Sequence, residues 1–157
     1  MKRILTFVLA LSMALSLAAC GGKADDNKKN DNNTEVTMTV QEIMDTLKEK
    51  LGDSFGCDVA EAEDNISGYW GLDMTQVESW ASMSNSNSAV NSSYAVIVKV
   101  KDGCAQDAAA LLQTGYEQIL SYSRMYNMDL QKVLQARLFV NGNYVALLIL
   151  GAQCDWE

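Results

Sequence analysis

The chain has 157 residues, 48% of them hydrophobic, and its 12 Lys and Arg against 20 Asp and Glu give a formal net charge of -8. This length fits one domain with some extra chain. A phosphate-binding surface needs clustered basic residues, and residues 51–98 contain no Lys or Arg, so we expect no nucleic-acid partner. The chain also lacks His and Pro, which excludes imidazole chemistry and the cis-Pro of a thioredoxin-like site.

The first twenty residues have the pattern of an export signal. Lys2 and Arg3 precede an apolar stretch at residues 4–17, which at 1.5 Å per residue is too short to cross ~30 Å of hydrocarbon. It ends in Leu-Ala-Ala-Cys-Gly at residues 17–21, which resembles a bacterial lipoprotein processing site. We therefore predict a signal peptide at residues 1–19 and lipidation of Cys20. The alternative is an ordinary signal peptide with a Cys near its cleavage site.

The segment that follows has the composition of a tether. Residues 21–38 carry three Lys and four acidic residues and few apolar ones, too few to offset the entropy of ordering. We predict that residues 20–38 form the lipidated Cys and a disordered linker, whose r.m.s. span is ~25 Å. Two or more acyl chains make a stable anchor. The expected location is therefore the outer face of the cell membrane, with a single folded domain at residues 39–157.

Helical and strand patterns divide this domain. Thr39 and Glu42 form a capping box, and the apolar residues that follow repeat at helical spacing as far as Gly52, which predicts a helix over residues 40–51. The acidic run at residues 58–64 lacks the alternating ligands of a calcium loop, so we expect a solvated loop there. The remaining predicted elements are a strand at 75–83, a polar loop at 84–93, a strand at 94–101, a helix at 105–126, a short helix from an Asp129 cap to 135, and a hairpin of 137–140 and 143–150 around Asn141-Gly142.

Two details of this pattern carry structural consequences. Gly115 lies inside the long predicted helix, where it costs about 1 kcal/mol relative to Ala, and so indicates close packing. The last strand is apolar on both alternating sets of side chains, which indicates cover on both faces. We expect an α+β fold, with a mainly antiparallel sheet of four or five strands and the helices packed on one face. The second face of the last strand is then covered by the segment 53–74 or by a partner. The candidate partner-binding residues are Tyr144, Val145, Leu147 and Ile149.

The order of these elements resembles a family of small Gram-positive surface lipoproteins known as a domain of unknown function. The resemblance covers residues 39–153. It is carried by Ser92-Ser93 before a strand that ends in Lys99-Val100-Lys101-Asp102, and by Gly142-Asn143-Tyr144-Val145. It implies a lipid-anchored α+β domain and carries no activity.

Three cysteines remain beside Cys20. They are Cys57, Cys104 and Cys154, spaced 47 and 50 residues apart. No C-x-x-C pair is present, so neither a redox dithiol nor a zinc ribbon is encoded locally. We expect no metal and no cofactor. The three thiols are either all free or divided into one disulfide and one free thiol, and the sequence does not choose between these.

No catalytic constellation is recognisable. A cysteine nucleophile needs an activating base, usually His. Ser92 and Ser93 do not have S-x-x-K spacing to Lys99 or Lys101, so we interpret these as strand and loop residues. The carboxylate pairs of glycosidases come from distant positions. A small carboxylate-dependent hydrolase of the cell envelope is therefore the alternative function.

Partner class follows from charge and aromatic content. The three Trp and six Tyr offer rings for a cell-wall glycan, but a small domain needs most of its aromatics for its core. Residues 39–157 carry 7 basic and 16 acidic side chains, which anionic wall polymers would repel. The favoured prediction is a membrane-anchored, extracytoplasmic and non-catalytic lipoprotein that presents a small α+β domain to an envelope protein partner.

Overall fold

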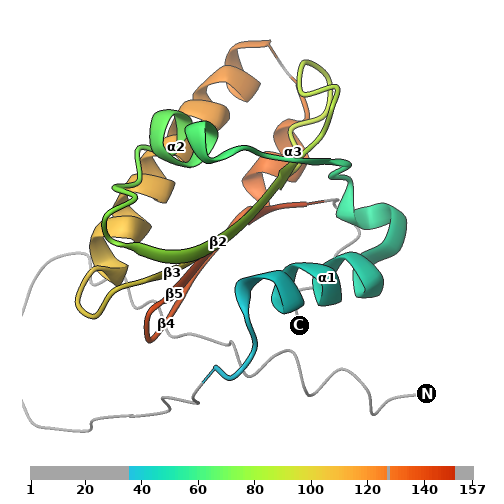
Figure 1. Ribbon diagram of the computed structural model, residues 1–157. Helices are drawn as coiled ribbons and strands as arrows, with labels where there is room; N and C mark the ends of the chain where they lie inside the picture. Colours follow the sequence, from blue (N-terminus) through green and yellow to red (C-terminus); the bar gives the residue numbers. More distant parts are fainter. Residues whose placement is uncertain (1–35, 127, 151–157) are drawn as a thin grey trace, which may run out of the picture.

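The computed structural model describes residues 36–126 and 128–150, which form an antiparallel sheet with helices (Figure 1). The sheet has five strands in the order β1-β2-β3-β5-β4. This confirms the α+β class and the antiparallel sheet of five strands. The predicted signal peptide, Cys20, Cys154, Trp156 and most of the tether lie outside the described residues. The strands are β1 Val59–Ala60, β2 Val77–Ser84, β3 Tyr94–Val100, β4 Arg137–Asn141 and β5 Tyr144–Ile149.

The helices lie on both faces of the sheet, which corrects the expectation of one face. One face is covered by α2 and α3, and the opposite face by α1 (Figure 1). The sheet therefore separates two apolar cores, and the strand pair β3 and β5 contributes side chains to both. The helical elements are α1 Val40–Leu51, η2 Gly52–Phe55, η3 Asn65–Tyr69, α2 Ala105–Tyr126 and α3 Leu130–Leu134.

Helix α1 begins as its sequence predicts. The backbone N–H of Glu42 donates to the Thr39 hydroxyl, and the backbone N–H of Thr39 donates to the Glu42 carboxylate at 2.8 Å. This reciprocal pair satisfies two of the N–H groups that every helix N-terminus leaves without an internal partner. The helix ends at Gly52, whose φ is 50°. Val40 and Met44 are buried against the sheet, so the amphipathic pattern sets which face of α1 packs.

The final strand is covered on both faces, as its apolar pattern predicts. Val145, Leu147 and Ile149 point into the core beneath α2. Ala146, Leu148 and Leu150 belong to the core on the α1 side. The register pairs Ala146 with both Ile97 on β3 and Phe139 on β4, so all three lie on the α1 face.

The turn between β4 and β5 lies one residue later than the sequence indicated. Its two loop residues are Gly142 and Asn143, because Asn141 pairs with Tyr144 as the last residues of the ladder. Gly142 has a φ of 56°. A glycine at the first loop position is typical of a type II′ hairpin, which matches the twist of the flanking strands. The Asn-Gly pair thus located the hairpin but misplaced its centre.

The weakly patterned segment from 53 to 74 contributes to both cores. Phe55 is buried on the α1 side, and Trp70 is 2% exposed on the α2 side. Trp70 lies directly against Gly115, where a Cβ atom would be 2.7 Å from Cε3 of the indole. The predicted close packing at Gly115 is therefore confirmed, and the large ring that requires it comes from a segment that the pattern left unassigned.

Candidate binding surface

The residues predicted to form a partner site on β5 are mostly inaccessible. Val145, Leu147 and Ile149 are at most 1% exposed, because α2 covers them. This corrects their assignment: in the folded domain they are core residues and offer no surface to a partner. Tyr144 is half-buried on the opposite face, and its hydroxyl donates to the Met38 carbonyl at 3.0 Å. It fixes the entry of the chain into the domain.

The exposed apolar surface gathers instead at the end of α2. Tyr122, Met125 and Tyr126 are 51%, 72% and 57% exposed. Their spacing of three and four residues places them on one side of the last two turns. The rings of Tyr122 and Tyr126 pack together with centroids 4.5 Å apart. We call these three residues the α2-end patch, a contiguous apolar surface that the rest of the described domain does not cover.

The α2-end patch and the chain entry lie at opposite ends of the domain. Met38 is held beside the β4–β5 turn by Tyr144, and Asp102, just before α2, accepts a hydrogen bond from Asn143 in that turn. From this end α2 runs for 22 residues, about 33 Å at 1.5 Å per residue. Figure 1 shows the same arrangement, with the chain entering below the sheet and α2 ending above it. The patch therefore lies at the end of the domain opposite Met38.

Sequence reasoning missed the patch because the apolar spacing that predicts the helix at 105–126 does not separate Tyr122 and Tyr126 from the buried residues of that helix. The spacing is the same for a buried and an exposed stripe. What differs is which residues the fold covers: the buried stripe continues from Ile119 to Ser123, which are 7% and 0% exposed, while Tyr122 beside it is 51% exposed. The available signal was Met125, next to Arg124. With Met125 included, the apolar side of the last turns is wider than one buried helix face.

A polar cluster joins α3 to the loop before β3. The Lys132 ammonium group donates to Asn91 Oδ1 at 2.6 Å, to Asp129 Oδ2 at 3.0 Å and to Ser93 Oγ at 3.2 Å. The same Asp129 oxygen accepts from the Ser92 backbone N–H at 2.9 Å. Asp129 was predicted to cap α3 with its side chain. It instead adopts a φ of 47° and makes no side-chain cap bond, because its carboxylate binds the loop and Lys132.

This cluster brings a serine and a lysine together, but in an arrangement suited to structure. An ammonium group has three N–H donors, and Lys132 uses all three. Ser93 is fully buried, and a Cβ on the neighbouring Gly56 would lie 2.6 Å from its hydroxyl oxygen. A substrate has no space to approach that oxygen. Lys99, one of the two lysines weighed for a dyad from the sequence, pairs with Glu78 at 2.9 Å.

One carboxylate of the predicted acidic loop accepts hydrogen bonds inside the fold. Glu61 Oε2 accepts from the Trp70 indole N–H at 3.2 Å and from the Ser82 hydroxyl at 2.5 Å. These bonds attach the segment before η3 to the indole and to β2. Asp58 accepts from the backbone N–H and hydroxyl of Ser86, which hold its carboxyl pKa below the ordinary value.

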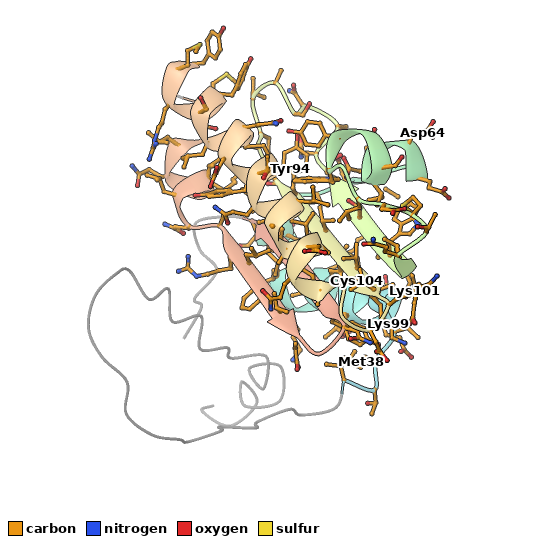
Figure 2. All side chains as sticks on the ribbon, turned by 90° about the vertical axis from the view of Figure 1, so that its left-hand side faces the viewer. Met38, Asp64, Tyr94, Lys99, Lys101 and Cys104 are labelled. Atoms are coloured by element: carbon orange, nitrogen blue, oxygen red, sulfur yellow. The ribbon has the colours of Figure 1, made fainter. Side chains whose placement is uncertain are left out.

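Two tyrosines extend this site to the surface. The Tyr69 and Tyr94 rings are stacked with centroids 6.3 Å apart, and both meet Trp70 edge-on. Burial, and then the neighbouring Tyr94 and Glu61, raise the pKa of Tyr69 to about 12. Burial also raises the pKa of Tyr94. In Figure 2, Tyr94 lies between α2 and the segment that carries Asp64. These phenols stay protonated at neutral pH, and their rings form a packed aromatic cluster.

The two described thiols are free and lie in different cores. Cys57 is buried on the α1 side, where desolvation raises its pKa to about 12 and leaves it a poor nucleophile at neutral pH. Cys104 is half-buried on the α2 side, beside the start of that helix (Figure 2). Cys154 lies outside the described residues. Over residues 36–126 and 128–150, no cluster of three or more Cys, Asp or Glu side chains is placed to hold a metal ion.

Comparisons with known proteins found no relative of this chain. No family model, curated protein or solved structure matches the chain. None of the helices in the described part has the length and apolar character of a membrane span.

Proposed function

We propose that the chain is a membrane-anchored extracytoplasmic lipoprotein that acts without catalysis and presents its α+β domain to a protein partner of the cell envelope. The observation that carries this proposal is the α2-end patch, three exposed apolar side chains at 51%, 72% and 57% exposure. Exposed aromatic and Met side chains are enriched at protein interfaces. The resemblance to small Gram-positive surface lipoproteins is consistent with the same role.

The arrangement of the two ends supports this proposal. The predicted anchor, Cys20, joins the domain through the linker that enters beside Tyr144, and α2 carries the patch about 33 Å from that end. A linker span of ~25 Å adds to this distance. A flexible linker would let the domain turn so that the patch points away from the membrane.

The charge around the patch favours a protein partner over an anionic glycan. Residues 118–128 contain Arg124 and no acidic residue, whereas the chain as a whole carries a net charge of -8. An apolar surface beside one basic residue fits the apolar surface of another protein, while the net negative charge of the domain repels an anionic polymer. The hydrolase alternative gains no observation in its favour from the described residues.

Site-specific photo-cross-linking in the producing cells tests the patch. A photoreactive residue at position 122 or 125 should give one adduct of the same partner, and one at Val59, which is 43% exposed on β1, should not. Tyr122→Ser combined with Met125→Ser should weaken binding of that partner about tenfold or more, since truncation of a Tyr that anchors an interface costs ~2 kcal/mol. Adducts that are equally frequent at all three positions, or an unchanged affinity, contradict the patch.

The anchor needs a separate experiment. Metabolic labelling with an alkyne fatty acid should mark the wild-type chain and leave Cys20→Ala unmarked, because the thiol of Cys20 is the predicted acceptor. Equal labelling of both chains, or of neither, contradicts the lipoprotein assignment. The photo-cross-linking result does not depend on that outcome.

A further inference from the structure

The shortest strand leaves most of one sheet edge open. β1 pairs with Met83 and Ser84 of β2, and the backbone N–H of Glu61 donates to the Ser82 carbonyl at 2.9 Å. The chain then turns away into η3. Among the described residues, no strand pairs with the outer side of β2 at residues 77–81. Figure 1 shows β2 in front of β3, β5 and β4, with α1 below it.

The backbone of this edge directs hydrogen-bonding groups outward. Successive residues of an antiparallel ladder point their N–H and C=O groups to alternate sides. Trp80 lies two residues before Ser82, whose carbonyl points to the β1 side, so the Trp80 N–H and C=O also point away from β3. The Gln76 carbonyl accepts from Lys101 on the β3 side, so Val77 directs its groups outward as well. Within the described part of the chain, these groups face no partner strand.

The apolar core beneath α2 reaches the surface at this edge. Met74, Val77 and Trp80 are half-buried side chains packed against that core. Trp80 pairs with Val98, which is fully buried beneath α2, so the indole lies on the α2 face of the edge strand. A further strand would cover these side chains with apolar side chains of its own, as neighbouring strands do on a shared face.

The charge around the edge defines the occupant. Residues 51–98 include η2, β1, η3 and β2, and they carry seven acidic side chains and no Lys or Arg. Glu63 and Asp64 are exposed and follow Glu61 directly, where the chain leaves the edge. A second copy of the chain would bring two acidic edges together, and like charges across a strand pair are destabilising. A segment with basic side chains is attracted instead.

We propose that the outer edge of β2 at residues 77–81 binds an extended segment of another protein, which carries alternating apolar and basic side chains, as a further strand antiparallel to β2. The segment lies on the same side of β2 as β1 and exchanges two backbone hydrogen bonds with Trp80. Its apolar side chains cover the α2 face of the edge. Its basic side chains lie near Glu63 and Asp64.

This edge is a second surface, and the inference depends neither on the lipid anchor nor on the α2-end patch. Val59 on β1 pairs with Ser84, which lies four residues, or ~14 Å, along β2 from Trp80. A photoreactive residue at Val59 therefore does not report on the edge at residues 77–81.

A synthetic peptide, Lys-Val-Lys-Val-Lys-Val-Lys, tests the edge on the full chain in mild detergent. Its Val side chains should share the face of Trp80, so the Val N–H groups point at β2 and the Lys N–H groups point away. Methylation of the Val amide nitrogens should weaken binding about tenfold in fluorescence anisotropy, because backbone hydrogen bonds are lost. Methylation of the Lys amide nitrogens, the matched control, should weaken it less than about threefold. Equal losses would mean that charge alone attracts the peptide, and would overturn the proposal.

Two exposed carboxylates test the charge. Glu63→Lys should weaken binding of the Lys peptide about fivefold at low ionic strength, because a basic side chain of the peptide loses its acidic neighbour. Glu117→Lys, on the exposed side of α2, makes the same change in net charge and should alter binding less than about twofold. The circular dichroism spectrum should be unchanged in both variants. Equal effects of the two substitutions contradict a site at this edge.

Photolabelling locates the peptide on the chain. A benzophenone at the central residue of the Lys peptide should label residues 74–82. Label on the α2-end patch, or label spread evenly over the domain, overturns the proposal. A full chain that is dimeric through β2 and does not bind the peptide overturns it as well, because the occupant is then a second copy.

Discussion

At the scale of single residues, the position of the Trp70 ring depends on the absence of a side chain at Gly115. An edge of the indole approaches the helix backbone this closely only because position 115 has no Cβ, and two of its ring carbons would be 2.7 and 2.8 Å from such an atom. The indole N–H donates to Glu61, so the ring also connects α2 to the chain before η3. A single glycine thus determines how closely an irregular segment packs on the longest helix.

We expect Gly115→Ala to destabilise the protein by about 1–3 kcal/mol. Alanine favours a helix interior by about 1 kcal/mol over glycine, but the added methyl group forces the buried indole out of its position, and overpacking costs more than that gain. Gly68→Ala is the matched control, because a Cβ at Gly68 meets no atom within 4 Å. Chemical denaturation measures both. A stability of Gly115→Ala equal to or above that of Gly68→Ala would show that Trp70 moves freely.

At the scale of elements, Lys132 acts as a latch between α3 and the loop of residues 84–93. Its side chain is 16% exposed and holds three acceptors, two of them from that loop. Asp129, its partner just before α3, also accepts from the loop backbone at Ser92. The loop is therefore positioned by side chains of a helix 36 or more residues further along the chain, and its own Ser and Asn residues would otherwise favour many turn conformations.

We expect Lys132→Met to lower the free energy of unfolding by about 2 kcal/mol, because three partly buried acceptors lose a charged donor at once. Lys99→Met is the control: Lys99 pairs with Glu78 across β2 and β3, but both side chains are more than a third exposed. Such surface pairs contribute at most about 1 kcal/mol. Equal losses in the two variants, measured by urea titration, would show that the latch is no stronger than a surface ion pair.

Elements whose sequence repeats with one clear period were predictable, and those held by distant contacts were not. The bounds of α1 and α2 follow from apolar spacing, a capping box and terminal glycines. By contrast, β1 and η3 are held by residues far along the chain. Glu61, next to β1, accepts a hydrogen bond from Ser82, 21 residues away. Trp70, next to η3, packs against Gly115, 45 residues away. Local periodicity carries no information about such partners. The same limit concealed the α2-end patch, since the apolar spacing does not show that Ser123 is buried and Tyr122 exposed.

At the scale of the whole molecule, the sheet is a partition between two cores that are built from different parts of the chain. The core beneath α2 combines η3, α2 and α3 with β3 and β5, and the core beneath α1 combines α1 and η2 with the other faces of the same strands. The expectation of helices on one face failed for this reason. The α1 pattern shows that the helix has an apolar side, but not which face of the sheet receives it.

The position of β5 between β3 and β4 also determines how the chain must fold. β3 and β5 are neighbours in the sheet, yet 43 residues lie between Val100 and Tyr144. The hairpin β4–β5 and the helix α2 form from local contacts, whereas closing this long loop costs entropy before either core is complete. We expect association of β3 with β5 to be the rate-limiting step. Stopped-flow refolding should then slow in Val98→Ala, which weakens the pair with Val145, while Met44→Ala in α1 mainly accelerates unfolding. The reverse pattern would place the docking of α1 earlier than the closure of the sheet.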